Sequence, residues 1–140
     1  MSQPFNKYNA FIGQMCLKTV NINTDTFVIF LSNTAPSAAT STYSVANITE
    51  IATGGGYTQG TGIALTTGSN TNSSGTYTWV GTAALFTATG AVAQFDYAII
   101  NDTTASNYLM GWYQCVSAIT MANTDTFQIS WGSNQIATWA

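Results

Sequence analysis

The chain has 140 residues, of which 46% are hydrophobic and only 5% are charged, and its formal net charge at pH 7 is −3. Ordinary globular domains are about a quarter charged, so most surface polarity here must come from Thr, Ser, Asn and Gln. With two lysines, no arginine and no histidine, the chain has no phosphate clamp, no basic face for nucleic acid, no Ser-His or Cys-His pair and no histidine metal site. We expect a single domain over residues 1–140.

A surface with so few charges loses little hydration free energy when another protein covers it. It also lacks the like-charge repulsion that keeps monomers apart. The composition therefore favours an assembled working state. The alternative is a monomer that keeps its solubility through hydroxyl and amide groups.

The start of the chain, MSQPFNKYNAFIGQM, has no basic stretch followed by an apolar core, so we expect no secretory signal and no membrane partner. The apolar runs are far shorter than the ~20 residues that span a bilayer. Cys16 and Cys115 are too few for a disulfide framework. Two buried free thiols are expected, and a bridge between them requires the N-terminal segment to pack against the strand that holds Cys115.

The first predicted element is a helix over about residues 4–18. Phe5, Tyr8, Ile12 and Met15 recur at spacings of three and four and form one apolar stripe. The lysine that ends this range suits the negative end of a helix dipole. The sequence therefore predicts one amphipathic N-terminal helix.

Strands and turns are predicted for the remainder of the chain. Short segments of alternating polarity are separated by turn-forming Gly, Asn and Ser clusters, which favours a mainly β fold, an antiparallel β-sandwich of jelly-roll type. The irregular stretch Asn33–Asn47 is long enough to be a contact element. The predicted strands are Thr24–Ser32, Tyr57–Thr67, Gly75–Gly81, Ala84–Ala88, Ala91–Asn101, Asn107–Val116, Thr124–Gly132 and Gln135–Trp139.

The pentapeptide NTDTF occurs twice, at Asn23–Phe27 and at Asn123–Phe127. Asn and Asp bond their own backbone in tight turns, and the residues that follow suit a half-buried strand. We therefore assign Asp25 and Asp125 to structural turns. The alternative is a glycosidase pair, which needs the two carboxyl groups roughly 5–10 Å apart.

Aromatic side chains are the other candidates for contact with partners. Trp79 and Trp112 lie in predicted strands, and we expect both to be buried. Trp139 is the best candidate for an intermolecular anchor. No catalytic residue, metal site or cofactor is predicted, because no EF-hand run of carboxylates or other motif supports one. The candidate interface residues are Phe5, Tyr8, Pro36, Tyr43 and Trp139.

Six short motifs, in order, resemble small virion structural proteins of tailed bacteriophages. They are DTFVIFLSNTAPS at 25–37, NITEIA at 47–52, GGYT at 55–58, IINDT at 99–103, LMGW at 109–112 and DTFQI at 125–129. The resemblance implies a non-enzymatic β-sandwich of the head decoration (cement) class. Such a protein would be assembled in the host cytoplasm and would sit on the capsid surface as a homotrimer that bridges major capsid protein subunits.

The alternative within this resemblance is a tail or fibre component that binds host glycans through exposed aromatic residues. Charged residues that are usual around the turns of this class are replaced here by Asn, Thr and Gln. Attachment through hydrogen bonds and apolar contacts is therefore expected in place of salt bridges.

Overall fold

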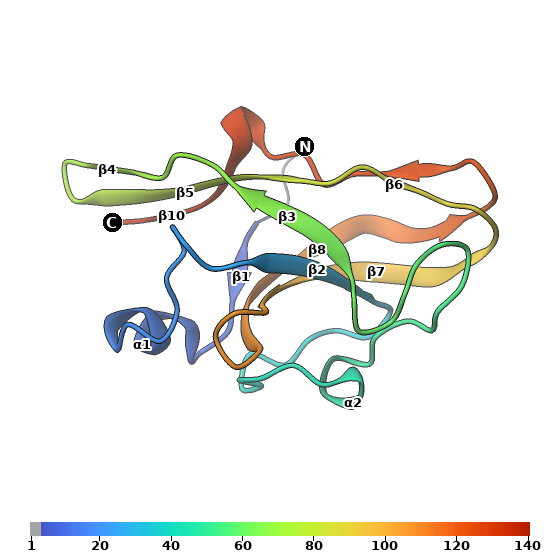
Figure 1. Cartoon of the computed structure of the whole chain (residues 1–140), viewed down its shortest axis with the longest axis horizontal. Coiled ribbons are helices and arrows are strands. Elements are labelled where there is room, and N and C mark those ends of the chain that lie inside the picture. Colours follow the sequence, from blue (N-terminus) through green and yellow to red (C-terminus); the bar gives the residue numbers. More distant parts are fainter. Residues whose placement is uncertain (1–3) are drawn as a thin grey trace.

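The computed structural model describes residues 4–140 and is mainly β, with two short helices (Figure 1). All strand pairs are antiparallel, so the predicted fold class is confirmed. The strands are β1 (Asn6–Lys7), β2 (Phe27–Ser32), β3 (Ile63–Thr67), β4 (Thr71–Ser73), β5 (Thr76–Ala83), β6 (Phe86–Thr87), β7 (Val92–Asp102), β8 (Tyr108–Met121), β9 (Thr126–Phe127) and β10 (Gln135–Trp139).

Eight of these strands form one sheet in the order β1-β8-β7-β2-β3-β5-β10, with β4 paired to β5. The sheet curls into a half-barrel, so its two halves face each other like the layers of a sandwich (Figure 1). β6 and β9 form a separate two-stranded sheet. The sequence-distant strands β1 and β10 therefore lie at the two ends of one continuous sheet.

The predicted helix over residues 4–18 is wrong in its first half. The structure has α1 at Phe11–Cys16, whereas β1 pairs with β8, and Lys7 lies opposite Gly111. A Cβ atom on Gly111 would lie 2.2 Å from Cζ of Phe5. Only glycine at this position therefore lets the segment that contains Phe5 and β1 pack against β8. The apolar spacing that suggested a helix is satisfied by a short strand followed by a short helix.

Glycine also shortens the strand predicted from Tyr57. Gly60 and Gly62 have φ of +83° and +68°, and a Cβ on Gly62 would lie 2.7 Å from the carbonyl oxygen of Ile29. These left-handed positions form a turn, so β3 begins only at Ile63. The segment predicted as a strand over Thr124–Gly132 is reduced to the two residues of β9, because a turn precedes β9 and residues 128–131 are irregular before a short 3-10 helix, Gly132–Asn134.

The main core fills the space between the two layers, and Trp79 at its centre is fully buried. A second cluster covers the outer face of β2 and β7 and consists of Tyr8, Phe30, Ile48, Ile99 and Leu109. Ile48 belongs to α2 (Val45–Ile48), which begins where the Oγ of Ser44 accepts the N–H of Asn47. The stretch Asn33–Asn47, expected to be a contact element, thus leads into a segment that packs on its own sheet.

Candidate functional site

The two ends of the curled sheet are joined by aromatic rings and not by a strand ladder. Phe5, which precedes β1, lies edge-on to Trp79 of β5 and Trp139 of β10, with ring centroids 6.3 and 6.2 Å apart. Phe11 of α1 lies 5.2 Å from Trp139. We call this contact between β1 and β10 the seam.

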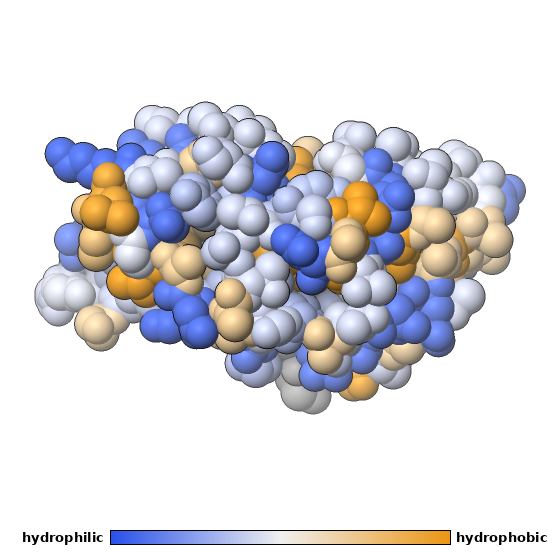
Figure 2. All heavy atoms as spheres, turned by 90° about the horizontal axis from the view of Figure 1, so that it is seen from below, coloured by the Kyte–Doolittle hydropathy of each residue, from blue (hydrophilic) through white to orange (hydrophobic). Residues whose placement is uncertain are grey.

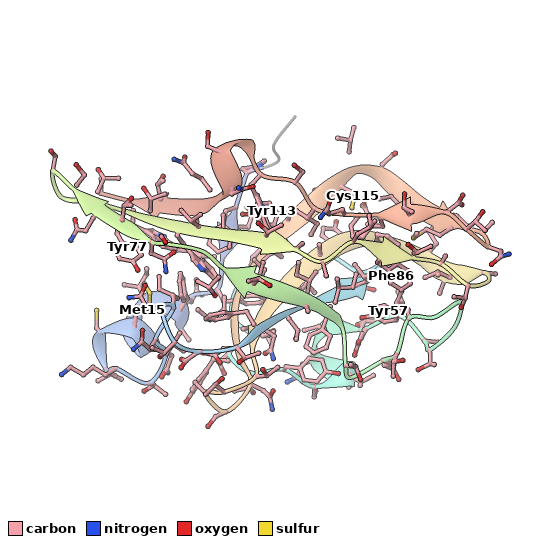
Figure 3. All side chains as sticks on the ribbon, turned by 45° about the horizontal axis from the view of Figure 1, so that its top comes forward. Met15, Tyr57, Tyr77, Phe86, Tyr113 and Cys115 are labelled. Atoms are coloured by element: carbon pink, nitrogen blue, oxygen red, sulfur yellow. The ribbon has the colours of Figure 1, made fainter. Side chains whose placement is uncertain are left out.

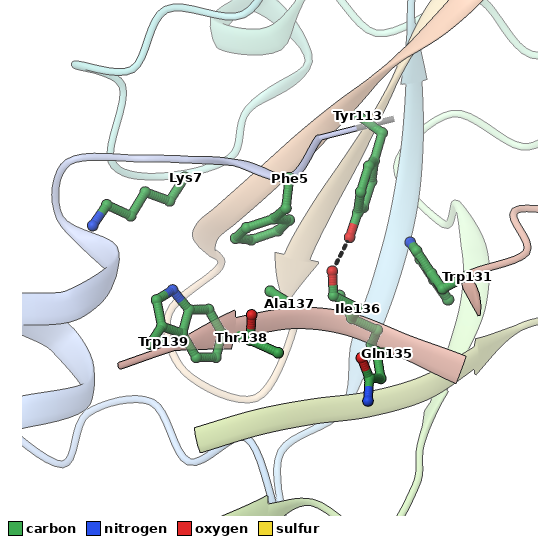
Figure 4. Close-up of a pocket in the computed structure, with 9 residues that line it drawn as sticks. All are labelled: Phe5, Lys7, Tyr113, Trp131, Gln135, Ile136, Ala137, Thr138 and Trp139. Carbon is green, nitrogen blue, oxygen red and sulfur yellow. Dashed lines mark hydrogen bonds between the residues drawn. The ribbon is translucent and has the colours of Figure 1, made fainter. Parts of the chain in front are cut away.

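A groove of about 470 Å³ runs along the seam (Figure 4). The hydroxyl of Tyr113 on β8 crosses it and donates to the carbonyl of Ile136 on β10, and burial raises the pKa of this tyrosine. The groove is lined by Phe5, Lys7, Tyr113, Trp131, Gln135, Ile136, Ala137, Thr138 and Trp139. Lys7 is the only charged residue in this lining, so the groove carries a single positive charge and no carboxylate.

A second hollow, the aromatic pocket, lies between α1 and β5 and has a volume of about 570 Å³. Trp139 lines both this pocket and the seam groove. Its half-buried ring therefore forms the ridge between two depressions. The aromatic pocket is lined by Ile12, Met15, Lys18, Val20, Asn21, Ile22, Tyr77 and Trp139.

The surface around these hollows carries little charge. The whole chain has seven charged side chains, two basic and five acidic, and two of the acidic ones, Glu50 and Asp102, are buried. Figure 2, which views the molecule from below Figure 1, shows one face on which residues of intermediate hydropathy separate small apolar and hydrophilic patches. A partner that covers such a face removes water from few charged side chains.

The five candidate interface residues do not share one surface. Phe5 and Trp139 meet at the seam. Pro36 is half-buried elsewhere, in the loop after β2. Tyr43 stacks on Phe30, with centroids 4.1 Å apart. The expectation that Tyr8 lies at an interface is wrong, because this residue is 1% exposed and packs in the second cluster.

Glu50 ties together the long segment between β2 and β3. It is 6% exposed, and its carboxylate accepts hydrogen bonds from the hydroxyls of Tyr43 at 2.6 Å and Tyr57 at 2.7 Å and from the N–H of Gly60 at 3.0 Å. Burial, followed by the adjacent carboxylate, raises the pKa of both tyrosines. Tyr57 also accepts the N–H of Leu31 on β2 at 3.1 Å, so the network fixes this segment to the sheet.

Each aspartate of the NTDTF repeat accepts a backbone N–H within its own turn. Asp25 accepts from Asn21 at 2.6 Å, and Asp125 accepts from Ala122 at 2.8 Å. These are the contacts that a structural turn requires. The repeat therefore marks two local turns of similar construction, one before β2 and one before β9.

The two repeat aspartates lie at opposite ends of β7. Asp25 adjoins Asp102 at the end of this strand, whereas the carbonyl of Asp125 accepts the N–H of Ala88, four positions before the strand begins. Eleven residues of strand correspond to roughly 30 Å. Asp25 and Asp125 are therefore too far apart to act as a glycosidase pair, which corrects that alternative.

The neighbour of Asp25 is a buried carboxyl group that the sequence did not single out. Oδ1 of Asp102 accepts the N–H groups of Thr104 and Ala105 at 2.8 and 2.9 Å, and Oδ2 has no partner among residues 4–140. Burial, and then the adjacent Asp25, raises the pKa of Asp102 to about 6. An Asp followed by two threonines signals the turn, but nothing local signals that Asp25 lies beside it.

Both cysteines are free. Cys16 is exposed at the end of α1, which corrects its expected burial, and Cys115 is half-buried on β8. Burial and then Asp96 raise the pKa of Cys115 to about 11, so its thiol stays protonated at neutral pH.

Within residues 4–140, no three His, Cys, Asp or Glu side chains gather in a way that could hold a metal ion. Over the same part of the chain, no helix combines the length and the apolar character needed to cross a lipid bilayer. Comparisons with protein-family models, with curated proteins and with solved structures gave no match. The sequence motifs and the geometry of the seam are therefore the basis for assigning a function.

Proposed function

We propose that this chain is a structural protein of a tailed-phage particle, most specifically a head decoration protein. In this proposal it works as a homotrimer on the capsid surface, bridges neighbouring major capsid protein subunits, is assembled in the host cytoplasm and catalyses no reaction. The observation that carries the proposal is the nearly neutral surface around the seam, where Trp139 stands between two hollows.

The surface explains how such a protein would attach. Charged groups lose hydration when an interface forms, and few of them are exposed here. A half-buried tryptophan between two depressions has the shape of an interface anchor, because the ring can fill or frame a complementary pocket on a neighbour. Many copies, each with a modest contact, would together stabilise a shell through multivalency.

The motif resemblance supports the proposed location on the particle. It covers most of the chain in order, from residues 25–37 to residues 125–129. The mainly β fold is the kind of fold that this resemblance implies. The alternative location, in a tail or fibre, shares the fold and the neutral surface and differs in what the protein touches.

The first test is the mass of the purified protein in dilute solution by size-exclusion chromatography with light scattering. A trimer of three 14.8 kDa chains has a mass of about 44 kDa. Trp139→Ala should weaken this assembly, whereas Trp112→Ala, which removes another half-buried tryptophan that packs on the second cluster at the outer face of the sheet, should not. A wild-type monomer at micromolar concentration would contradict the proposal.

The second test locates the protein on the particle. Immunogold labelling of the phage that carries the gene should decorate the head at symmetry-related positions. Labels confined to the tail would replace the head assignment with the tail or fibre role. The absence of label from purified particles, with the protein present in the lysate, would exclude a virion role altogether.

A further inference from the structure

Tyr77 and Trp139 are neighbouring rings that form an aromatic platform in the wall of the aromatic pocket. They lie directly opposite each other in the ladder between β5 and β10, so both side chains leave the sheet on the same face. Their ring planes differ by 30°, and their centroids are 6.3 Å apart. Figure 3 shows Tyr77 and, across the pocket, Met15 of α1.

Both rings are only half-buried. The face of an aromatic ring is electron-rich, and the C–H groups on one face of a pyranose ring are weakly electropositive. A platform of two adjacent rings therefore suits the apolar face of a sugar. The pocket volume of about 570 Å³ falls within the ~300–1,000 Å³ typical of small-molecule sites.

Polar groups border this platform. The side-chain oxygen of Asn21 accepts the N–H of Asn23 at 3.1 Å. The amide nitrogen of Asn21 has no protein partner in the described part of the chain and is exposed. The hydroxyl of Tyr77 donates to Asn23 Oδ1 at 3.3 Å, which holds the tyrosine ring in place. Asn21 can therefore donate to sugar hydroxyls beside a ring that is already positioned.

Lys18 is the only charged residue that lines the pocket, and its backbone conformation is unusual. It follows Leu17, the C-terminal cap of α1, and has a φ of +59°. Glycine is the usual residue at this left-handed position because a Cβ atom is disfavoured there. A lysine here also interacts favourably with the helix dipole, but α1 has only six residues. One of the two lysines of the chain therefore occupies a strained backbone position on the pocket rim.

We propose that the aromatic pocket binds an acidic sugar, a pyranose that carries a carboxylate, as in uronic and sialic acids. The sugar ring lies on Tyr77 and Trp139, its carboxylate meets the ammonium group of Lys18, and a hydroxyl accepts a hydrogen bond from Asn21. The positive charge of the rim selects an anionic ligand over a neutral one. The site includes Trp139, which the proposed function places at an interface between chains, so assembly and sugar binding compete for the same ring.

Isothermal titration calorimetry with trigalacturonic acid as probe, and galactotriose as its neutral counterpart, tests the proposal. The acidic sugar should bind saturably and the neutral one much more weakly. Lys18→Gln should weaken binding of the acidic sugar about tenfold, the value of one charge-assisted contact. The matched control is Lys7→Gln, which removes the other lysine, in the seam groove, and should leave binding unchanged.

Lys18→Gly separates the ligand role from a purely structural one. Because glycine tolerates the left-handed backbone, this variant should melt about 2–5 °C higher than the wild type and still lose binding of the acidic sugar. Retained binding in Lys18→Gly or in Lys18→Gln would overturn the proposal. So would equal loss in Lys7→Gln, equal affinity for the neutral sugar, or no saturable binding of trigalacturonic acid at millimolar concentration.

Discussion

The substitution Asp102→Asn probes the buried carboxyl group at the end of β7, which adjoins the half-buried Asp25. Because the pKa of Asp102 in the folded state is raised to about 6 from its ordinary value of 3.8, the native protein holds this proton more tightly than the unfolded chain. The stability that the tighter binding of this proton contributes to the folded state is fully present below pH 4 and is lost as the pH rises through 6. Wild-type stability should therefore contain a component that falls between pH 4 and pH 7.

The size of this component follows from the two pKa values. One pKa unit corresponds to about 1.4 kcal/mol, so the rise from 3.8 to about 6 sets an upper limit of about 3 kcal/mol. The rise comes first from the burial of Asp102 and then from Asp25, which is only half-buried, and solvent screening reduces the whole component to about 1–2 kcal/mol. Asparagine cannot ionise, and its oxygen can still accept the two N–H groups that Asp102 Oδ1 accepts.

The assay is urea unfolding at half-unit steps from pH 4 to pH 7.5, for the wild type and the variant. The unfolding free energy of Asp102→Asn relative to the wild type should increase with pH by about 1–2 kcal/mol across this range. Asp125→Asn is the matched control, because it alters the equivalent turn of the repeat, and it should show the same fall in stability as the wild type. A difference between Asp102→Asn and the wild type that stays constant with pH would refute the argument.

Three further changes test the packing by chemical denaturation. Gly111→Ala should destabilise the fold by about 2 kcal/mol or more, because the new methyl group collides with Phe5; unchanged stability would mean that β1 does not lie on β8. Tyr57→Phe should cost about 1.5–3 kcal/mol by removing a donor to buried Glu50, and a neutral effect would exclude that network. Ser44→Ala should cost about 1 kcal/mol, with no change expected if α2 is not capped.

Local patterns predicted several elements well. Gln135–Trp139 was predicted as a strand and has these bounds in the structure. The strong β-branched and aromatic content of β2 and β7 also identified both strands, because such residues favour a pleated, buried surface. Trp79 was expected to be buried, and it is, whereas Trp112, which was also expected to be buried, is only half-buried. These features depend on residues close together in the sequence.

The errors arose where a distant contact outweighed a local pattern. The stripe through Phe5 and Tyr8 fits a helix, but the partner that makes it a strand, Gly111, is about a hundred positions away. The candidate site shows the same limit. Trp139 could be singled out from its type, whereas its neighbours Tyr77 and Lys18 could not, because strand register and the end of α1 bring them together.

The seam has a consequence for synthesis of the chain. Phe5 and Trp139 are 134 positions apart in the sequence and yet lie on the two sides of one contact. While the chain is still being made, the half-barrel lacks β10, and the aromatic cluster around Trp79 is open to water. Closure must therefore be among the last folding events, and nascent chains halted before residue 135 should expose apolar surface that chaperones recognise.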